Sequence, residues 1–138
     1  MAAGWLFKTE PGAYSWDRLA RDGRTVWDGV KNALALKHLG AVASGDRVLI
    51  YHTGGEKAVM GVARVVRGAH PDPGQKDPRL LVVELEPVEA LPHPVPLAAM
   101  RANARLAGFE LLRLPRLSVM PVSAAQWAEI VRMARAPA

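Results

Sequence analysis

Short apolar runs, separated by turns that contain glycine and proline, are the feature that most restricts how this chain can fold. Side chains alternate between two faces in a strand, and the runs Trp5–Thr9 and Arg47–His52 show that alternation. Val and Leu dominate the runs Ala58–Val66 and Leu80–Leu85, and Leu117–Val122 is a shorter run near the end. The connections between these runs are hairpin-like. The pattern therefore predicts five or six short strands in a mostly antiparallel, curved sheet.

Helices between the strands are predicted by capping residues and by apolar side chains at helical spacing. Ser15 is expected to cap a short helix that continues to about residue 21. A second helix is expected from about Val30 to Leu39, with Gly40 at its end, and Leu97–Arg101 should form at least one helical turn. Ser123 is expected to cap a C-terminal helix. The 138 residues suffice for one core, so residues 1–138 are predicted to form a single α+β domain.

Three segments are expected to lie outside the strands. Thr53–Glu56 has the glycines of a hairpin loop. His70–Gly74 contains two prolines and a glycine, and Pro87–Pro96 contains four prolines, which cannot donate hydrogen bonds to a strand ladder. We therefore expect Pro87–Pro96 to cross the molecule as an irregular segment. Leu111–Pro115 fits no single class.

Composition excludes several classes of protein. The chain has no cysteine, which excludes disulfides and thiolate metal sites and is typical of a reducing compartment. No apolar run approaches the roughly 20 residues of a membrane span. The first residues lack the basic and long apolar regions of a signal peptide. We therefore expect a cytoplasmic protein without a membrane partner.

Positive charge is concentrated in two parts of the chain. The net charge is +5, which suits an anionic partner, although many basic proteins bind no anion. The first cluster comprises Arg18, Arg21, Arg24, Lys31 and Lys37, and the second comprises Arg101, Arg105, Arg113 and Arg116. Two such clusters could follow a phosphate backbone, but the charge alone leaves the partner open.

Residue spacing reveals neither a catalytic set nor a metal site. The four histidines are scattered, and no pair has the spacing of a helical or hairpin metal site. No serine lies in the setting of a nucleophile elbow, and Gly54-Gly55 lacks the remaining residues of a phosphate-binding loop. We therefore expect no metal and no cofactor. Two alternatives remain open: an enzyme with Asp28 or Glu10 as general acid or base, and a protein-interaction module that uses Pro87–Pro96.

The hexapeptide Trp27–Asn32 combines residue types that suit a nucleobase. Asp and Gly after the tryptophan predict a sharp turn at the entry to a helix. A pocket for a flipped-out base needs aromatic walls and an amide or carboxylate at the base edge. Trp27 would supply one wall and Tyr51 another. Asn32 or Asp28 would contact the edge. The two rings could equally be core residues, and Asn32 could face water in the first helical turn.

Taken together, these segments resemble the EVE domain family. The resemblance extends from about residue 4 to about residue 133. Its most specific motifs are the first strand and the hexapeptide Trp27–Asn32. The matching segments are Trp5–Pro11, Tyr14-Ser15, Trp27–Asn32, Gly45-Asp46, Tyr51-His52, Gly61–Ala63, Pro71-Asp72, Arg116–Val119, Pro121-Val122 and Trp127.

The resemblance implies a PUA-like fold, a small antiparallel β-barrel of five to six strands flanked by helices. It also implies a non-enzymatic module that reads a modified base in DNA or RNA, alone or with an unknown protein partner. Pocket residues implied by the motifs are Ser15, Trp27, Val30, Asn32, Tyr51, Arg116, Leu117 and Ser118, to which the residue chemistry adds Asp28. Lys8 and Glu10 match the first-strand motif, either as contacts or as structural residues. Flanking phosphates are expected on Lys8, Arg18, Arg21, Lys31, Lys37 and Arg113.

Overall fold

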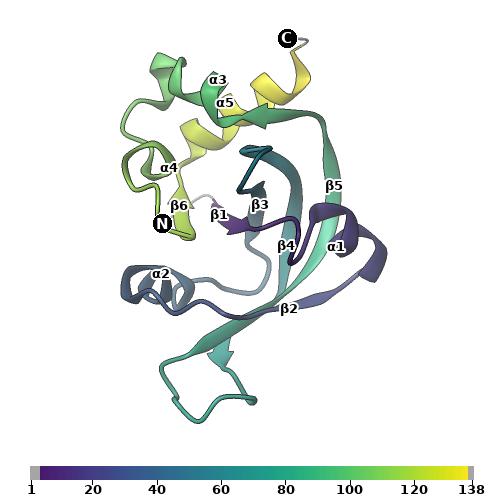
Figure 1. Ribbon diagram of the computed structural model, residues 1–138, viewed down its shortest axis with the longest axis vertical. Coiled ribbons are helices and arrows are strands. Elements are labelled where there is room, and N and C mark those ends of the chain that lie inside the picture. The colour runs from purple at the N-terminus through teal and green to yellow at the C-terminus, as the bar shows by residue number, and fades with distance from the viewer. Residues whose placement is uncertain (1–3, 137–138) are drawn as a thin grey trace.

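One curved sheet of six strands runs through the computed structural model, which describes residues 4–136 (Figure 1). The strands are β1 (Gly4–Thr9), β2 (Thr25–Trp27), β3 (Arg47–His52), β4 (Ala58–Pro71), β5 (Leu81–Pro96) and β6 (Val119–Val122). Their order across the sheet is β2-β5-β4-β3-β1-β6. Neighbouring strands are antiparallel except β1 and β3, which are parallel.

Five α-helices surround the sheet in the described residues. They are α1 (Trp16–Asp22), α2 (Ala33–Leu39), α3 (Leu97–Arg101), α4 (Glu110–Arg113) and α5 (Ala124–Arg135), with a 3₁₀ turn η1 at Ala104–Leu106. Figure 1 shows α3 and α5 above β1, with α4 to the left and α2 below β1. Helix α5 packs on β5 and η1, whereas α2 packs on β6 and β5. The expected α+β class is confirmed.

The sheet curls strongly but does not close into a barrel. Phe7 in β1 and Trp27 in β2 have ring centroids 5.7 Å apart, although three strands separate β1 from β2 in the sheet order. Within residues 4–136, no strand pairing joins β2 to β6. The sheet is therefore a mixed, open structure whose two ends approach each other, and its order contains the parallel β1–β3 pair that the sequence pattern did not indicate.

One segment predicted to be irregular lies in a strand, and a second does so only at its start. Strand β4 continues to Pro71 and so includes the first two residues of His70–Gly74, whereas the whole of Pro87–Pro96 lies in β5 and pairs with β4 near both of its ends. The prediction for Pro87–Pro96 was wrong because the β4–β5 ladder shifts register at four places, and such bulges absorb residues that do not fit a regular ladder. Strand β2 covers only Val83–Leu85 of β5. The prolines lie beyond that pairing, where one edge of β5 has no neighbouring strand among the described residues.

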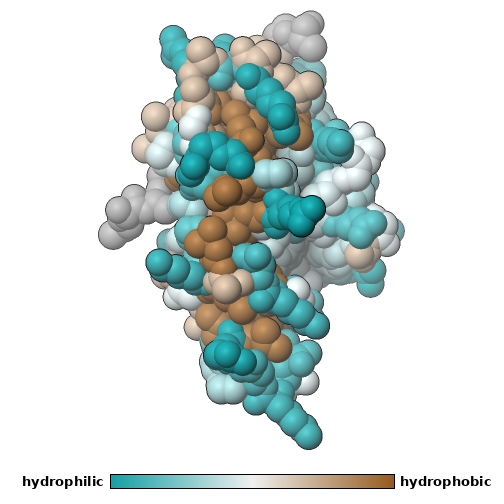
Figure 2. All heavy atoms as spheres, turned by 60° about the vertical axis from the view of Figure 1, so that its left-hand side comes forward, coloured by the Kyte–Doolittle hydropathy of each residue, from teal (hydrophilic) through white to brown (hydrophobic). Residues whose placement is uncertain are grey.

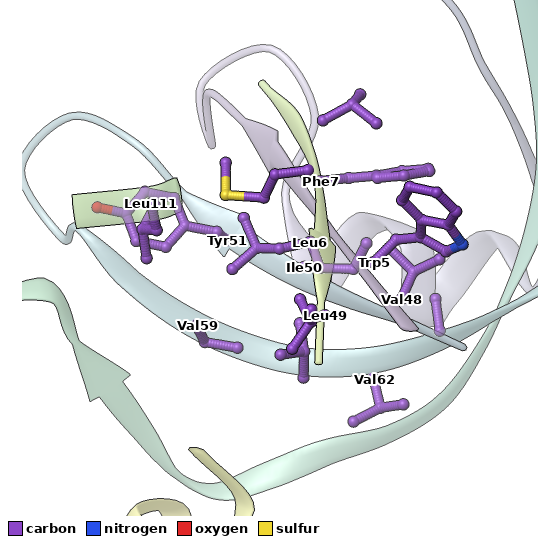
Figure 3. Packing of buried hydrophobic residues seen from close by; sticks show 14 of the residues in the cluster. Trp5, Leu6, Phe7, Val48, Leu49, Ile50, Tyr51, Val59, Val62 and Leu111 are labelled. Atoms are coloured by element: carbon purple, nitrogen blue, oxygen red, sulfur yellow. The ribbon is translucent and has the colours of Figure 1, made fainter. Parts of the chain in front are cut away.

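The core fills the inside of the curl. Leu6, Phe7, Leu49, Ile50 and Met120 are among its completely buried side chains, and Figure 3 shows how residues of β1, β3 and β4 meet there. Not all apolar surface is covered. Figure 2 shows a band of hydrophobic residues between charged borders on the side of the molecule that carries α2 and α4.

Two tryptophans lie directly on glycines of the sheet. A Cβ atom at Gly61 in β4 would lie 2.5 Å from the ring of Trp16, the first residue of α1. A Cβ atom at Gly4 in β1 would likewise lie 2.5 Å from the ring of Trp127 in α5. Real Cβ atoms do not approach other atoms so closely, so both helices need glycine beneath them to reach the sheet.

His52 ties the start of α1 to the end of β3. The side chain is buried, and its Nε2 accepts a hydrogen bond from the Trp16 backbone N–H at 2.9 Å. With Nε2 as acceptor, the neutral ring carries its proton on Nδ1, which lies 2.9 Å from the Glu56 carboxylate and donates to it. This chain of hydrogen bonds fixes the loop between β3 and β4 against α1.

Glu129 holds α5 against the segment that precedes β6. Its side chain is buried, and it accepts hydrogen bonds from Arg132 in the same helix and from Asn103 in the turn before η1. These donors, Arg132 first, lower the pKa of the Glu129 carboxyl to about 2.

The contact between Gly61 and Trp16 can be tested with Gly61→Ala. The added methyl group collides with a buried ring, so we expect a loss of about 1–3 kcal/mol in the free energy of unfolding, measured by urea denaturation. Gly55→Ala is the matched control, because a Cβ atom there meets nothing within 4 Å. Equal stability of the two variants would contradict the close packing of α1 on β4.

The Glu129 network should make stability depend on pH. A carboxyl whose pKa is lower in the folded chain than its unfolded value of 4.5 stabilises the fold above pH 4.5, and this effect disappears as the pH falls toward 2. The stability difference between the wild type and Glu129→Gln should therefore shrink between pH 4.5 and 2 in denaturant titrations. Glu89→Gln, at an exposed site, serves as the control. A difference that stays constant over this range would refute the network's role.

Candidate functional site

Two pockets lie on either side of the C-terminal end of β1. The larger has a volume of about 400 Å³ and is bounded by the end of β1, the loop before α1, and β2. We call it the Trp27 pocket. The polar and aromatic side chains that line it include those of Lys8, Glu10, Tyr14, Thr25, Trp27 and Asp28. The smaller has a volume of about 200 Å³ and lies between β3, α3 and α4. We call it the Tyr51 pocket, formed chiefly by Lys8, Tyr51, Gly54, Lys57, Arg101 and Leu111.

The Trp27 pocket lies where the curled sheet fails to close. Strand β2 is the last strand at one end of the sheet, and its three residues all line the pocket together with the last residues of β1. One of them, Val26, is about half exposed, so the pocket opens beside apolar surface. A volume of about 400 Å³ falls in the range of pockets that hold small ligands.

Aromatic rings form the inner wall of the Trp27 pocket. Trp27 is only 8% exposed, and the Tyr14 ring meets it edge-on at 6.2 Å. The Arg18 guanidinium lies 5.3 Å from the Tyr14 ring centroid, and the Tyr14 hydroxyl donates to Asp22 at 2.8 Å. Burial raises the pKa of the Tyr14 hydroxyl. Trp27 is therefore both a core residue and a pocket wall, so the two interpretations of this residue do not exclude each other.

Two carboxylates lie at the rim of the Trp27 pocket. Glu10 and Asp28 are exposed and line the opening. As ionised groups they accept hydrogen bonds only. The Thr9 hydroxyl, which also lines the pocket, donates to the Tyr14 carbonyl at 2.7 Å. The rim therefore offers acceptors to a ligand that enters from solvent.

Lys8 belongs to both pockets. Its side chain is half-buried, and its Nζ donates to the Pro115 carbonyl at 2.8 Å while lying 5.8 Å from the centroid of the Tyr51 ring. Burial lowers the pKa of the Lys8 ammonium group. Its backbone N–H donates to the Ser118 carbonyl at 2.9 Å. The ammonium group and the backbone N–H of Lys8 thus both donate hydrogen bonds to the segment that leads into β6.

The Tyr51 pocket is cationic. Tyr51 is 3% exposed, and burial raises the pKa of its hydroxyl, an effect that the nearby Arg101 opposes. Figure 3 shows the Tyr51 ring beside Leu111, and Lys57 supplies a further positive charge at the rim. Trp27 and Tyr51, which we expected to enclose the same base, therefore line different pockets separated by Lys8.

Three residues of the expected pocket take structural positions instead. The Ser15 hydroxyl accepts from the Arg18 N–H at 3.1 Å and caps α1, and the Asn32 side chain accepts from the Ala35 N–H at 3.1 Å and caps α2. Val30 is buried in the core. Ser15, Asn32 and Val30 line neither of the two pockets. Helix α2 begins at Ala33 because Asn32 ends the preceding turn, so the predicted start at Val30 was wrong.

No residue of the run Arg116–Ser118 lines the Trp27 pocket or the Tyr51 pocket, and only Ser118 in the run hydrogen-bonds to Lys8. Leu117 is buried in the core, Arg116 is exposed, and the Ser118 carbonyl continues the pairing between β1 and β6. Ser118 therefore helps to position the end of β1, which carries Lys8.

The expected phosphate-binding residues are spread over several surfaces. Arg18 lies 4.0 Å from Asp22, and Arg113 lies 3.5 Å from Glu110. Arg21 is exposed on α1. Lys31 and Lys37 border a third hollow of about 450 Å³, between α2 and the loop that joins β4 to β5.

Sequence reasoning did not single out three residues that line the pockets. Thr25 and Tyr14 face the Trp27 pocket, and Lys57 faces the Tyr51 pocket. Tyr14 was part of a quoted motif, which could have indicated it. Lys57 follows a Gly-Gly loop, and no local pattern marks it.

Within residues 4–136, no three His, Asp or Glu side chains gather as metal ligands. No helix in that part of the chain has the length and apolar character needed to cross a bilayer.

Comparisons with known proteins give consistent relatives. A model of the EVE domain family matches residues 3–133. Human thymocyte nuclear protein 1 is 25% identical over 157 residues, which covers 89% of this chain and 70% of that protein. The solved structure of Rpa0253 from Rhodopseudomonas palustris is 38% identical, with a TM-score of 0.91, and covers 96% of this chain and 92% of its own.

A structure of the human protein in complex with DNA that contains 5-methylcytosine shares the fold. It is 23% identical, has a TM-score of 0.89, and covers 98% of this chain and 99% of its own.

The capping role of Asn32 can be separated from ligand contact by two substitutions. Asn32→Ala removes the acceptor for the Ala35 N–H and should cost about 1 kcal/mol of unfolding free energy, whereas Asn32→Asp retains an acceptor and should cost much less. Urea denaturation of both variants measures the difference. Two variants of the same stability would show that the cap does not stabilise α2.

Proposed function

We propose that this chain, which belongs to the EVE domain family, is a non-enzymatic module that binds nucleic acid and holds one modified base in the Trp27 pocket. The observation that carries the proposal is the pocket itself. It combines an aromatic wall, a rim of carboxylates and a neighbouring cationic pocket at one end of β1. The human relative solved with 5-methylcytosine DNA supports the choice of ligand class to test.

A base that leaves its stack needs apolar or aromatic contact for its faces and hydrogen-bonding groups for its edge. Trp27 and Tyr14 offer rings at the inner wall. Thr25 and Asp28 offer polar atoms near the rim. A single base is small enough for a pocket of about 400 Å³, and the open rim leaves its sugar in solvent.

The carboxylates favour bases that carry an exocyclic amino group. Asp and Glu side chains accept hydrogen bonds from the 4-amino group of cytosine or the 6-amino group of adenine, whereas uracil, thymine and guanine carry a carbonyl oxygen at the corresponding position. Asp28 and Glu10 would repel that oxygen. We therefore propose a modified cytosine or adenine as the ligand, in DNA or RNA.

The two other functions considered from the sequence have less support. Asp28 and Glu10 are exposed at the rim, where bulk water reaches them and competes for any transferred proton. Pro87–Pro96 is part of β5 and pairs with β4 near both of its ends, so it is not a free proline-rich segment that could dock in a partner's groove.

A binding panel tests the proposal. Short single- and double-stranded DNA and RNA, with plain, methylated or hydroxymethylated cytosine and with methylated adenine or thymine, would be titrated against the wild type and Asp28→Asn. Asp28→Asn removes the negative charge and replaces one acceptor oxygen with an NH₂ donor, which should weaken binding of the preferred amino-bearing base by about tenfold, in line with about 1–3 kcal/mol for a good base contact. Binding to thymine-containing strands should not weaken.

Asp17→Asn is the matched control, because Asp17 is also an exposed acid but lies outside the pocket. Equal effects of the two substitutions, or wild-type binding that ignores base modification and disappears with salt, would contradict a base-reading pocket and leave only a basic surface.

A further inference from the structure

The Tyr51 pocket concentrates positive charge among its lining residues. Lys8, Lys57 and Arg101 line it, and no Asp or Glu is among its lining residues in the described part of the chain. Three cations around about 200 Å³ repel one another, so the pocket favours an anion that neutralises them.

The acid closest in sequence is engaged elsewhere. Glu56 precedes Lys57, but its carboxylate accepts from the buried His52 ring at 2.9 Å. That contact holds the carboxylate toward α1, because the other nitrogen of His52 accepts from the first residue of that helix. The Glu56 carboxylate therefore pairs with His52 and is not among the groups that line the Tyr51 pocket.

Lys8 is positioned to serve an anion. Its ammonium group has three donors, one of which is used by the Pro115 carbonyl. Burial has removed part of its water and lowers its pKa, so the charged form gains from a new acceptor. The Tyr51 ring beneath it fixes the direction of the side chain.

Lys57 is held in a conformation that favours glycine. Its φ of 42° makes it the sole non-glycine residue with positive φ among residues 4–136. Its carbonyl accepts from the Leu97 N–H at 2.7 Å, which ties the β3–β4 loop to the start of α3. Residues other than glycine are destabilised by steric contacts of Cβ at positive φ, so the presence of a lysine at this site indicates a role for its charge.

We propose that the Tyr51 pocket binds a phosphate group of the nucleic acid whose base occupies the Trp27 pocket. Arg101 supplies a planar fork that matches phosphate oxygens, and the two lysines supply point charges. The shared wall at Lys8 places the two pockets next to each other, as a base and a phosphate of one strand require. The identity of the base rests on the function proposed above, whereas the anion site does not.

Inorganic phosphate is the first probe. Adding it to the isotope-labelled full chain should shift the amide NMR signals around Gly54, Lys57 and Arg101 in a saturable way. Lys57→Gln combined with Arg101→Gln should weaken this binding by at least tenfold, because each lost contact is a charge-assisted hydrogen bond.

The control is Lys76→Gln combined with Arg105→Gln. These side chains are exposed and lie outside both pockets. Because each double variant loses one Lys and one Arg, the two have the same net charge. Equal weakening in both variants, or shifts spread over the whole basic surface, would overturn the site. Lys57→Gly guards against misfolding, because it relieves the positive-φ backbone and should fold at least as well while binding phosphate more weakly.

Nucleosides and nucleotides then connect the two pockets. The modified cytosine and adenine nucleosides of the binding panel, such as 5-methyl-2′-deoxycytidine, would be titrated against the wild type and the Lys57/Arg101 variant, together with their 5′- and 3′-monophosphates and dinucleotides that contain them. At least one phosphorylated form should bind about tenfold more tightly than the nucleoside, and the variant should remove that gain. A gain for the dinucleotide alone identifies a backbone phosphodiester, whereas a gain for a monophosphate identifies a terminal phosphate.

The two proposals fail in different ways. Phosphate binding without any nucleoside binding would refute the base pocket and retain the anion site. Nucleoside binding that gains nothing from any phosphate would overturn the anion site as part of the nucleic-acid interface and retain the base pocket.

Discussion

The contact of Trp27 with Phe7 and Tyr14 is the interaction on which the arrangement of this molecule depends. Strands β1 and β2 are not neighbours in the sheet, so only side-chain packing brings the two ends of the curl together. Because β2 has just three residues and no pairing to β6 among those described, the packing leaves an opening rather than a closed ladder. That opening is the Trp27 pocket. A core contact and a binding surface thus arise from one ring.

Local patterns predicted most of the fold. Alternation located β1 and β3, and Ser15 and Ser123 marked the starts of α1 and α5, because these signals act within a few residues. The errors arose where the secondary structure of a segment depends on pairing with a segment that is distant in the sequence. Proline in β5 is acceptable only because the strand has a free edge and a bulged ladder, and β2 is too short to show a pattern before it pairs with β5. The parallel pairing of β1 with β3 was equally invisible.

The site was harder to predict, because the type of a residue does not reveal where its side chain points in the folded chain. Asn32 has the right chemistry for a base edge, yet its acceptor caps α2. Leu117 belongs to a motif that borders the site, yet it packs in the core. Lys57 had no sequence signal, since its place depends on a loop whose backbone is fixed by α3. Motif resemblance found the region, and only the tertiary arrangement divided it into two pockets.

The shared position of Lys8 has a thermodynamic consequence. One ammonium group faces two compartments, so a ligand that rearranges its hydrogen bonds in one compartment changes what it offers to the other. Linkage requires such an influence to be reciprocal: the factor by which an occupant of the first compartment alters affinity in the second equals the factor in the opposite direction. The affinity of a fragment for one compartment, measured first with the other compartment empty and then with it filled, therefore gives the cooperativity that this lysine transmits.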